Sequence, residues 1–175
     1  MNWVALFSQT GSEIANLSKI IGCKPDLILT NNITQDKYEY HPDVSPHVRF
    51  KHDFLMEYLR GVRSDDTIIT LHGYLRIIPP DVCDKFEMYN GHPGLITMYP
   101  QLKGKDPQER ITPEMTHVGS VVHKVTAGVD EGEIVSVVST ENTGGDYYNV
   151  LRQTSLEAWK KVLLILTERE NGTKR

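Results

Sequence analysis

Short apolar runs and helical patterns alternate through the first third of the chain. Trp3–Ser8 and Asp26–Thr30 are nearly continuous in apolar residues, which is typical of buried strands in a parallel sheet. Between them, Glu13–Ile21 places apolar residues at helical spacing, and Gly22 follows where a helix can end in a left-handed cap. This order of strand, turn and helix predicts a first βα unit.

The same alternation continues to the middle of the chain. Residues 31–46 are polar and predict a long loop, whereas Asp53–Arg60 again has helical spacing. We expect the larger apolar side chains of this helix to face the core: Phe54, Leu55, Tyr58 and Leu59. The β-branched run Thr67–Leu71 predicts the central strand. The other expected elements are a short strand at Val48–Lys51, a short helix that begins at Pro79 and Pro80 and ends at Phe86, and a strand at Met88–His92.

The C-terminal part of the chain predicts two more strands and a long helix. Val118–Val125 and Glu133–Ser139 are rich in β-branched residues, and a loop with glycines and acidic residues joins them. From an N-cap at Asp146 to about Glu168, apolar residues recur at helical spacing. Together the elements predict a single-domain, Rossmann-like α/β fold with a mostly parallel central sheet and flanking helices. The expected domain spans residues 1–168, and residues 169–175 are expected to fray.

Composition narrows the classes of partner. The chain has 175 residues and a net charge of -4, so it has no general electrostatic attraction to nucleic acid or to anionic membranes. Its N-terminus lacks the pattern of a signal peptide, and no apolar run has the length of a membrane span. We therefore expect a soluble, cytoplasmic protein of one domain.

Neither the cysteines nor the histidines predict a metal site. Cys23 and Cys83 are isolated, so neither a disulfide framework nor a zinc ribbon has support. Four histidines flank the segments discussed below, and none has a ligand partner at short spacing: His72, His92, His117 and His123. We expect no metal.

The segment Asn90–Leu102 carries the most distinctive candidate chemistry. Asn90 and His92 are two residues apart, so in a strand their side chains leave the same face. Pro93 and Gly94 then turn the chain, which places the pair at the end of a strand. An amide donor and an imidazole that converge in this way can act on a carbonyl group. The polar residues 101–116 that follow are a plausible lid.

Asp130 is the carboxylate that could complete such a site. It lies in the glycine-rich loop between the last two predicted strands. A carboxylate beside His92 would orient the imidazole and raise its pKa, or relay a proton. The residues alone also allow a structural alternative, in which His92 bonds to a turn and Asp130 caps backbone N–H groups. The pattern leaves both interpretations open.

The turn Thr10–Gly11–Ser12 has two interpretations as well. A small turn at a helix N-terminus presents backbone N–H groups and can hold a phosphate. However, Glu13 places negative charge where a phosphate would lie, and a single glycine is far from a nucleotide-binding fingerprint. The alternative is a plain turn that caps the helix.

Four segments in order resemble the folate-dependent formyltransferases, and within them most closely the glycinamide ribonucleotide transformylases. Residues 90–102, with Asn-Gly-His-Pro followed by Leu95, Tyr99 and Pro100, resemble the family's Asn-x-His-Pro-Ser-Leu-Leu-Pro segment. Residues 3–12 with the Gly-Ser turn, residues 73–77 (Gly-Tyr-Leu-Arg-Ile) and residues 122–134 match three further family segments. The resemblance covers most of the chain and implies the formyltransferase fold.

The resemblance also implies an activity and its residues. The formyl group of 10-formyltetrahydrofolate, the implied co-substrate, would be transferred to a primary amine, with Asn90 and His92 polarising the formyl group and Asp130 assisting proton transfer. The implied folate-binding residues are Leu75, Arg76, Ile77, Ile78, Ala127, Gly128, Val129 and Asp130. The implied acceptor-binding residues are Thr10, Gly11, Ser12, Glu13 and Glu157. No metal is implied.

Departures from the family pattern concern the acceptor. Glu13 replaces the family's asparagine after Gly-Ser, and Leu156 or Glu157 stands where the family has an acidic residue on the last helix. Glycinamide ribonucleotide, in purine biosynthesis, is the acceptor that the resemblance favours. An amino sugar nucleotide, or an aminoalkyl-modified nucleobase or nucleotide, is the alternative. Hydrolysis of the formyl-folate and a non-catalytic folate-binding module are the remaining hypotheses.

Overall fold

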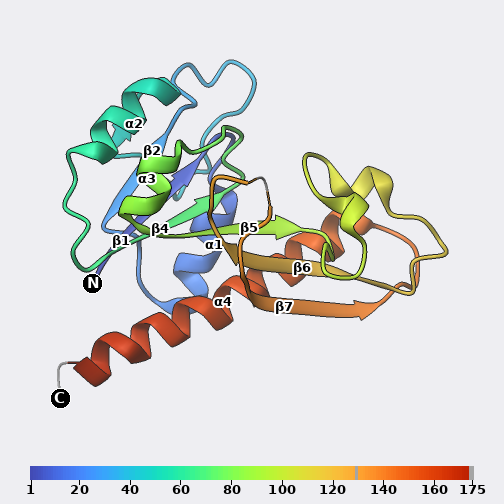
Figure 1. Cartoon of the computed structure of the whole chain (residues 1–175). Helices are drawn as coiled ribbons and strands as arrows, with labels where there is room; N and C mark the ends of the chain where they lie inside the picture. Colours follow the sequence, from blue (N-terminus) through green and yellow to red (C-terminus); the bar gives the residue numbers. More distant parts are fainter. Residues whose placement is uncertain (129, 174–175) are drawn as a thin grey trace. The chain divides into compact units, whose positions relative to one another are not determined.

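The computed structural model describes residues 1–128 and 130–173, which form two compact units (Figure 1). Unit 1 comprises Met1–Asn90 and Val125–Ala127. Unit 2 comprises Gly91–Lys124 and the residues from Gly128 onward. Strand β5, Glu87–Pro93, runs from one unit into the other, so each unit is described below with its own part of this strand.

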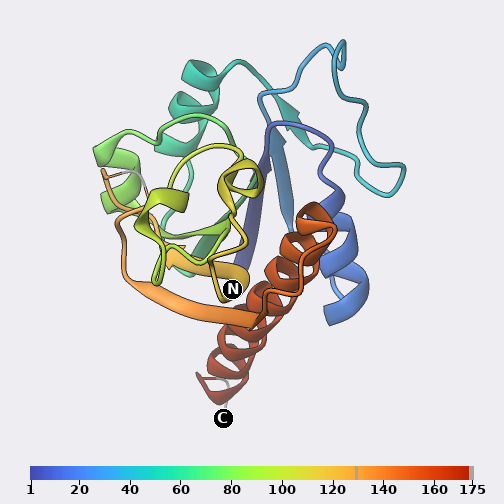
Figure 2. The same ribbon diagram turned by 90° about the vertical axis from the view of Figure 1, so that its right-hand side faces the viewer.

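Unit 1 is built on parallel strands. In the sheet its strands have the order β3-β2-β1-β4-β5, and each neighbouring pair is parallel. Residues 31–47 form a long loop, drawn in pale blue in Figure 2. The elements before β5 are β1 (Asn2–Phe7), α1 (Ser12–Ile21), β2 (Leu27–Thr30), β3 (Val48–Arg49), α2 (His52–Arg60), β4 (Thr67–His72) and α3 (Pro80–Lys85).

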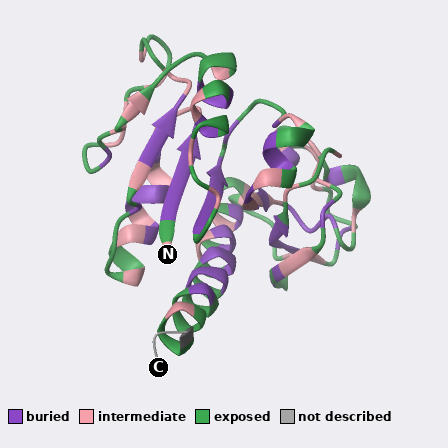
Figure 3. Ribbon diagram, turned by 60° about the vertical axis from the view of Figure 1, so that its left-hand side comes forward, coloured by how far each residue is buried: buried purple, intermediate pink, exposed green. Residues whose placement is uncertain are grey.

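Most of the predictions for the strands and helices of unit 1 agree with which residues lie in its core. All six residues of β4 are buried, as expected for a central strand. Figure 3 shows most of the length of the long strands in purple, the colour of buried residues. Gly22 ends α1 in the left-handed conformation and donates its N–H to the Ser18 carbonyl, as predicted. One expectation for α2 is wrong: Phe54 is 65% exposed, and Met56 takes a core position with Leu55 and Leu59. The spacing 55, 56 and 59 is also a helical stripe, and Phe54 contacts Phe50 instead.

Unit 2 combines an antiparallel strand pair with the long C-terminal helix. After the end of β5 come β6 (His117–Lys124) and β7 (Ile134–Glu141), which pair antiparallel with an irregularity between Val122 and His123. Two short 3-10 helices, η1 (Pro100–Leu102) and η2 (Pro107–Arg110), lie in the segment that the sequence predicted as a polar loop. Helix α4 (Tyr147–Thr173) packs on β6 and β7.

Helix α4 ends further along the chain than its apolar pattern predicted. The pattern faded at about Glu168, whereas the helix ends at Thr173. Residues 168–172 contain no apolar side chain that could mark a buried face, but Glu and Arg favour helix on their own. None of the helices in the described part of the chain is long and apolar enough to cross a membrane.

The buried Trp159 explains why the residue between Asn90 and His92 is a glycine. A Cβ atom at Gly91 would lie 2.3 Å from Nε1 of Trp159, a fully buried residue of α4. The face of β5 that carries Gly91 is therefore closed by this indole. Because side chains alternate along a strand, Asn90 and His92 leave the opposite face. The described residues thus confirm the predicted α/β class with a mostly parallel sheet.

Candidate functional site

His92 is a buried side chain on the last residues of β5. Its Nε2 lies 2.7 Å from the backbone oxygen of Leu102, so this nitrogen carries a proton and donates it. The other ring nitrogen, Nδ1, lies 3.3 Å from Oδ2 of Asp130. Burial lowers the pKa of His92, and the charge of Asp130 and the Leu102 carbonyl only partly oppose this effect. Asp130 thus raises the pKa of His92, as a neighbouring carboxylate was expected to do, but burial has the larger effect and sets the net direction.

Asp130 is a carboxylate that several donors hold in its ionised form. Its side chain is 8% exposed, and its backbone has a positive φ of 52°, which aspartate tolerates better than most residues. Oδ2 accepts the Gly104 N–H at 3.0 Å, and Oδ1 lies 3.1 Å from His123 Nε2. Burial alone would raise the pKa of Asp130, but the hydrogen bond from His123, the charge of His92 and the Gly104 N–H lower it to about 2.

His123 is a member of this site that the sequence suggested only as a possible metal ligand. It lies near the end of β6, and its side chain is 4% exposed. Its Nδ1 lies 2.9 Å from the Lys124 carbonyl, while its Nε2 faces Asp130. Both nitrogens thus face oxygen atoms, one of a carbonyl and one of a carboxylate. A signal was present: a histidine inside a run of buried valines needs a polar partner.

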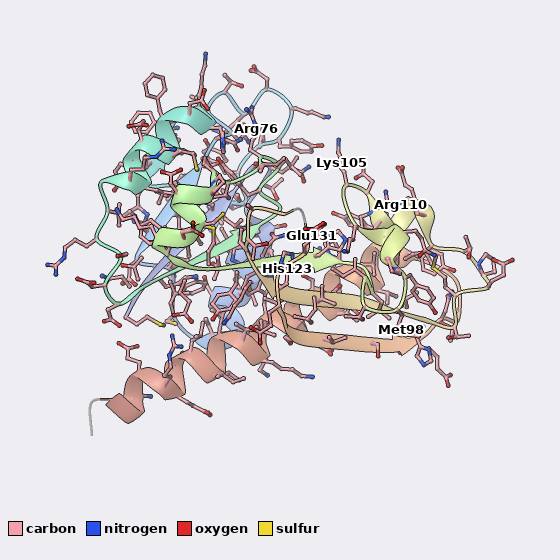
Figure 4. The ribbon with its side chains drawn as sticks, viewed as in Figure 1. Arg76, Met98, Lys105, Arg110, His123 and Glu131 are labelled. Atoms are coloured by element: carbon pink, nitrogen blue, oxygen red, sulfur yellow. The ribbon has the colours of Figure 1, made fainter. Side chains whose placement is uncertain are left out.

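We call His92, Asp130, His123 and their two backbone partners, Leu102 and Gly104, the Asp130 cluster. All five belong to unit 2. The residues alone left open whether His92 and Asp130 meet, and the structure places them in contact. The bonds of His92 to the Leu102 carbonyl and of Asp130 to the Gly104 N–H are also those that the structural alternative expected. Asn90 is two residues from His92 on β5 but belongs to unit 1. Figure 4 labels His123, beside which Asp130 is held, and Glu131, the residue that follows Asp130.

The implied folate-binding residues differ in their exposure. Leu75 and Ile77 are apolar side chains that are 51% and 67% exposed, and the exposed Arg76 lies between them. Ile78, in contrast, is buried in the core of unit 1. Ala127 is exposed and Gly128 is half-buried, whereas Val129 lies outside the described residues. Leu75 and Ile77 thus offer apolar surface to a ligand, whereas Ile78 packs in the core and does not reach the surface.

The implied acceptor turn contains an interaction that the sequence did not predict. Glu13 Oε1 lies 2.8 Å from Nδ1 of His72, whose side chain is fully buried. His72 Nε2 lies 2.8 Å from Thr70 Oγ1, which accepts the indole N–H of Trp3. We call Glu13, His72, Thr70 and Trp3 the Glu13 cluster. At the same turn, Thr10 Oγ1 accepts the Ser12 N–H, and Gly11 is left-handed with a φ of 74°.

Helix α1 therefore begins with its anion-binding capacity partly satisfied. Side-chain oxygens of Thr10 and Glu13 already lie at its first turn. Glu157, the other implied acceptor residue, is exposed on α4 in unit 2, whereas the turn belongs to unit 1. Across residues 1–128 and 130–173, no group of three or more His, Cys, Asp or Glu side chains is arranged to hold a metal ion.

Comparison with known proteins adds a family and a fold. The family model described as formyl transferase matches residues 27–165, which is most of the chain. A phosphoribosylglycinamide formyltransferase structure from Campylobacter jejuni is similar at a TM-score of 0.74 and 18% identity, over 97% of this chain and 96% of that one. Glycinamide ribonucleotide transformylase 1 from Geobacillus kaustophilus is similar at 0.75 and 21% identity, over 95% and 98%.

A protein of a different activity shares the fold too. A formyltetrahydrofolate deformylase from Pseudomonas syringae is similar at a TM-score of 0.64 and 20% identity, over 95% of this chain and 60% of that chain. At such identities the solved structures establish the fold alone.

Proposed function

This chain belongs to the formyl transferase family, and we propose that it moves the formyl group of 10-formyltetrahydrofolate to the primary amine of a small, nucleotide-like acceptor. The observation that carries the proposal is the buried contact of His92 Nδ1 with Asp130. His92 itself lies two residues after Asn90 on β5. A carboxylate held ionised beside an imidazole suits proton transfer at a carbonyl. Glycinamide ribonucleotide, after which the similar transformylase from Geobacillus kaustophilus is named, is the acceptor we place first.

The reaction requires one bond exchange and one proton transfer. The acceptor nitrogen bonds to the formyl carbon, and the bond from that carbon to N10 of the folate breaks. One proton leaves the acceptor nitrogen and one reaches N10, so that the products are a formamide and tetrahydrofolate. The residues must therefore stabilise the oxygen of the tetrahedral intermediate and carry a proton.

We assign these two tasks to Asn90 and His92. The carboxamide of Asn90 is the donor for the developing oxyanion. Since Nε2 of His92 donates to Leu102, Nδ1 is the nitrogen that takes the proton from the attacking amine and passes it to N10. The lowered pKa of His92 keeps Nδ1 able to accept a proton at neutral pH. The imidazolium formed in this step adds positive charge near the oxyanion and is stabilised by Asp130, 3.3 Å away.

The pterin is expected to bind the apolar segment around Leu75 and Ile77. Half or more of each side chain is exposed, and flat heterocycles bind apolar surfaces that carry a few fixed polar groups. The Leu75 N–H donates to Ser8 Oγ, which fixes the start of this segment on the residue that follows β1. Ala127, Gly128 and Asp130 are the other described residues that we assign to folate binding.

One observation supports a second class of acceptor. The carboxylate of Glu13, held by His72 at the first turn of α1, repels a phosphate and attracts a hydroxyl or an ammonium group. An aminoalkyl-modified nucleobase, or a nucleotide whose phosphate binds elsewhere, fits that charge better than glycinamide ribonucleotide does. We keep it as the alternative acceptor.

The test is an acceptor assay with the purified protein. Formation of tetrahydrofolate and of formate from 10-formyltetrahydrofolate is followed without acceptor, with glycinamide ribonucleotide, with amino sugar nucleotides and with aminoalkyl nucleosides. Tetrahydrofolate formed only in the presence of an amine, without formate, is the expected result. The most active amine identifies the acceptor.

The other outcomes separate the competing functions. Formate released at the same rate with and without an amine would mean that water is the acceptor, as in a deformylase. Tight folate binding without loss of the formyl group in any arm would mean a binding module, and would overturn the proposal.

A further inference from the structure

Arg110 is a charged side chain that makes many contacts and has no role in the proposed reaction. It is the last residue of η2, and its guanidinium donates to backbone oxygens of the preceding segment, four to nine residues away. Nε donates to Gln101 at 3.1 Å, and Nη2 donates to Leu102 at 3.2 Å and to Lys103 at 2.9 Å. Nη1 donates to Lys105 and Asp106.

Gly104 is the one residue of the segment 101–106 whose carbonyl does not appear among these acceptors. Its N–H instead donates to Asp130 Oδ2 at 3.0 Å, from a backbone with a φ of 90° that favours glycine. The five carbonyls that Arg110 gathers therefore fix the loop while one N–H turns toward Asp130. Figure 4 shows Arg110 and Lys105 on the same yellow segment.

Leu102 connects Arg110 to the other half of the cluster. Its carbonyl accepts both from Arg110 Nη2 and from His92 Nε2, so one oxygen atom joins the guanidinium to the imidazole. The loop thus supplies both backbone groups of the Asp130 cluster, and Arg110 binds the loop on either side of each.

We propose that Arg110 is a positioning residue, which holds segment 101–106 so that Leu102 fixes the ring of His92 and Gly104 fixes the carboxylate of Asp130. This inference rests on the proposed roles of His92 and Asp130. A planar guanidinium with five donors can bind several carbonyls at once, whereas the ammonium group of lysine is a compact charge on a flexible stem. The fork, and not only the charge, is therefore required.

The effect on turnover is expected in kcat more than in KM. Misplacement of a reacting group by about 1 Å can reduce a rate about a hundredfold, so we expect Arg110→Gln to lower kcat by about ten- to a hundredfold. Arg110→Lys, which keeps the charge, is expected to recover only a small part of the loss. Arg63→Gln is the matched control, because the side chain of Arg63 is 88% exposed.

Two readouts do not require turnover, and these separate this inference from the proposed function. The Gly104 amide, followed by 1H–15N NMR, should exchange with solvent about tenfold faster in Arg110→Gln, since its bond to Asp130 opens locally. The His92 ring, titrated by NMR, should show a raised pKa, because the guanidinium lowers it together with burial and His123, while Asp130 raises it. Arg110→Lys should leave the pKa of His92 nearer to that of the wild type, yet release the Gly104 amide.

These results decide between the possibilities. An unchanged Gly104 amide with wild-type kcat in Arg110→Gln overturns the inference. If Arg110→Gln does not fold, the same two measurements on Arg110→Lys decide, and full protection of Gly104 there shows that the fork is not needed. If the wild-type protein transfers no formyl group while Arg110→Gln still releases Gly104, the proposed function fails and the positioning role stands.

Discussion

The Asp130 cluster and the Glu13 cluster differ in the kind of groups that form them. The Asp130 cluster takes two of its five members from the backbone of a loop, and its carboxylate is 8% exposed. The Glu13 cluster consists of side chains carried by the regular elements α1, β4 and β1, and its carboxylate is 24% exposed. The carboxylate of Asp130 is thus held away from solvent by a loop. The carboxylate of Glu13 is held by side chains of a helix and two strands and remains partly exposed.

The difference indicates what each cluster can do. A buried carboxylate beside an imidazole of lowered pKa can stabilise a proton carrier, which is a task common to every formyl transfer. A carboxylate at the surface of a helix N-terminus affects which ligands can approach it, which is a task that varies with the acceptor. We therefore expect changes in the first cluster to abolish turnover and changes in the second to alter selectivity.

The largest effect is expected from His92→Ala. Loss of the proton carrier should lower kcat by about a hundred- to a thousandfold, which is typical of a general acid–base group. Steady-state kinetics with the best acceptor measures the change. His41→Ala is the control, because His41 lies on the long loop of unit 1. Turnover within a few-fold of wild type in His92→Ala would contradict the role given to this residue.

A smaller effect concerns stability in acid. The pKa of Asp130 is lowered to about 2 in the folded chain, from about 4 in an unfolded one, so the unfolded state binds more protons between these values. The free energy of unfolding should therefore fall by roughly 2 kcal/mol as the pH is lowered from about 4 to about 2. Burial of His92 adds a loss of the same sign as the pH falls below about 6.5.

Urea unfolding at a series of pH values measures both contributions. In Asp130→Asn, the free energy of unfolding should no longer show the decrease expected between about pH 4 and about pH 2. In Asp36→Asn, which changes an exposed residue, the decrease should remain. Identical pH profiles for Asp130→Asn and the wild type would show that the cluster does not stabilise the ionised carboxylate.

The sequence predicted the fold better than it predicted the faces of its elements. Continuous apolar runs identified β1 and β4 because strands buried on both faces need no alternation. Phe54 was misplaced because two overlapping stripes on α2 fit helical spacing, and only the neighbouring elements decide between them. The end of α4 was misplaced because its last turns carry no apolar side chain.

The candidate site was predicted in part for a similar reason. The resemblance to a known family implied that His92 and Asp130 serve one site, and the two side chains are in contact. Leu102 and Gly104 act through backbone atoms, which leave no mark in residue type except the glycine itself. The pair of Glu13 with His72 joins residues 59 positions apart, and no periodicity connects them.

The smallest expected effect is also the most specific to the Glu13 cluster. Glu13→Gln keeps an oxygen that can accept from His72 but removes the negative charge, so the free energy of unfolding should change by about 1 kcal/mol or less. Glycinamide ribonucleotide and its phosphate-free riboside share the amine and the ribose, and therefore isolate the contribution of the phosphate. In Glu13→Gln, kcat/KM for the ribonucleotide relative to the riboside should rise by roughly tenfold, because like charges no longer meet at the first turn of α1. Glu39→Gln, an exposed change in the same unit, should leave this ratio unaltered. An unaltered ratio in Glu13→Gln as well would mean that the acceptor's phosphate does not approach this turn, and that selectivity is set elsewhere in the chain.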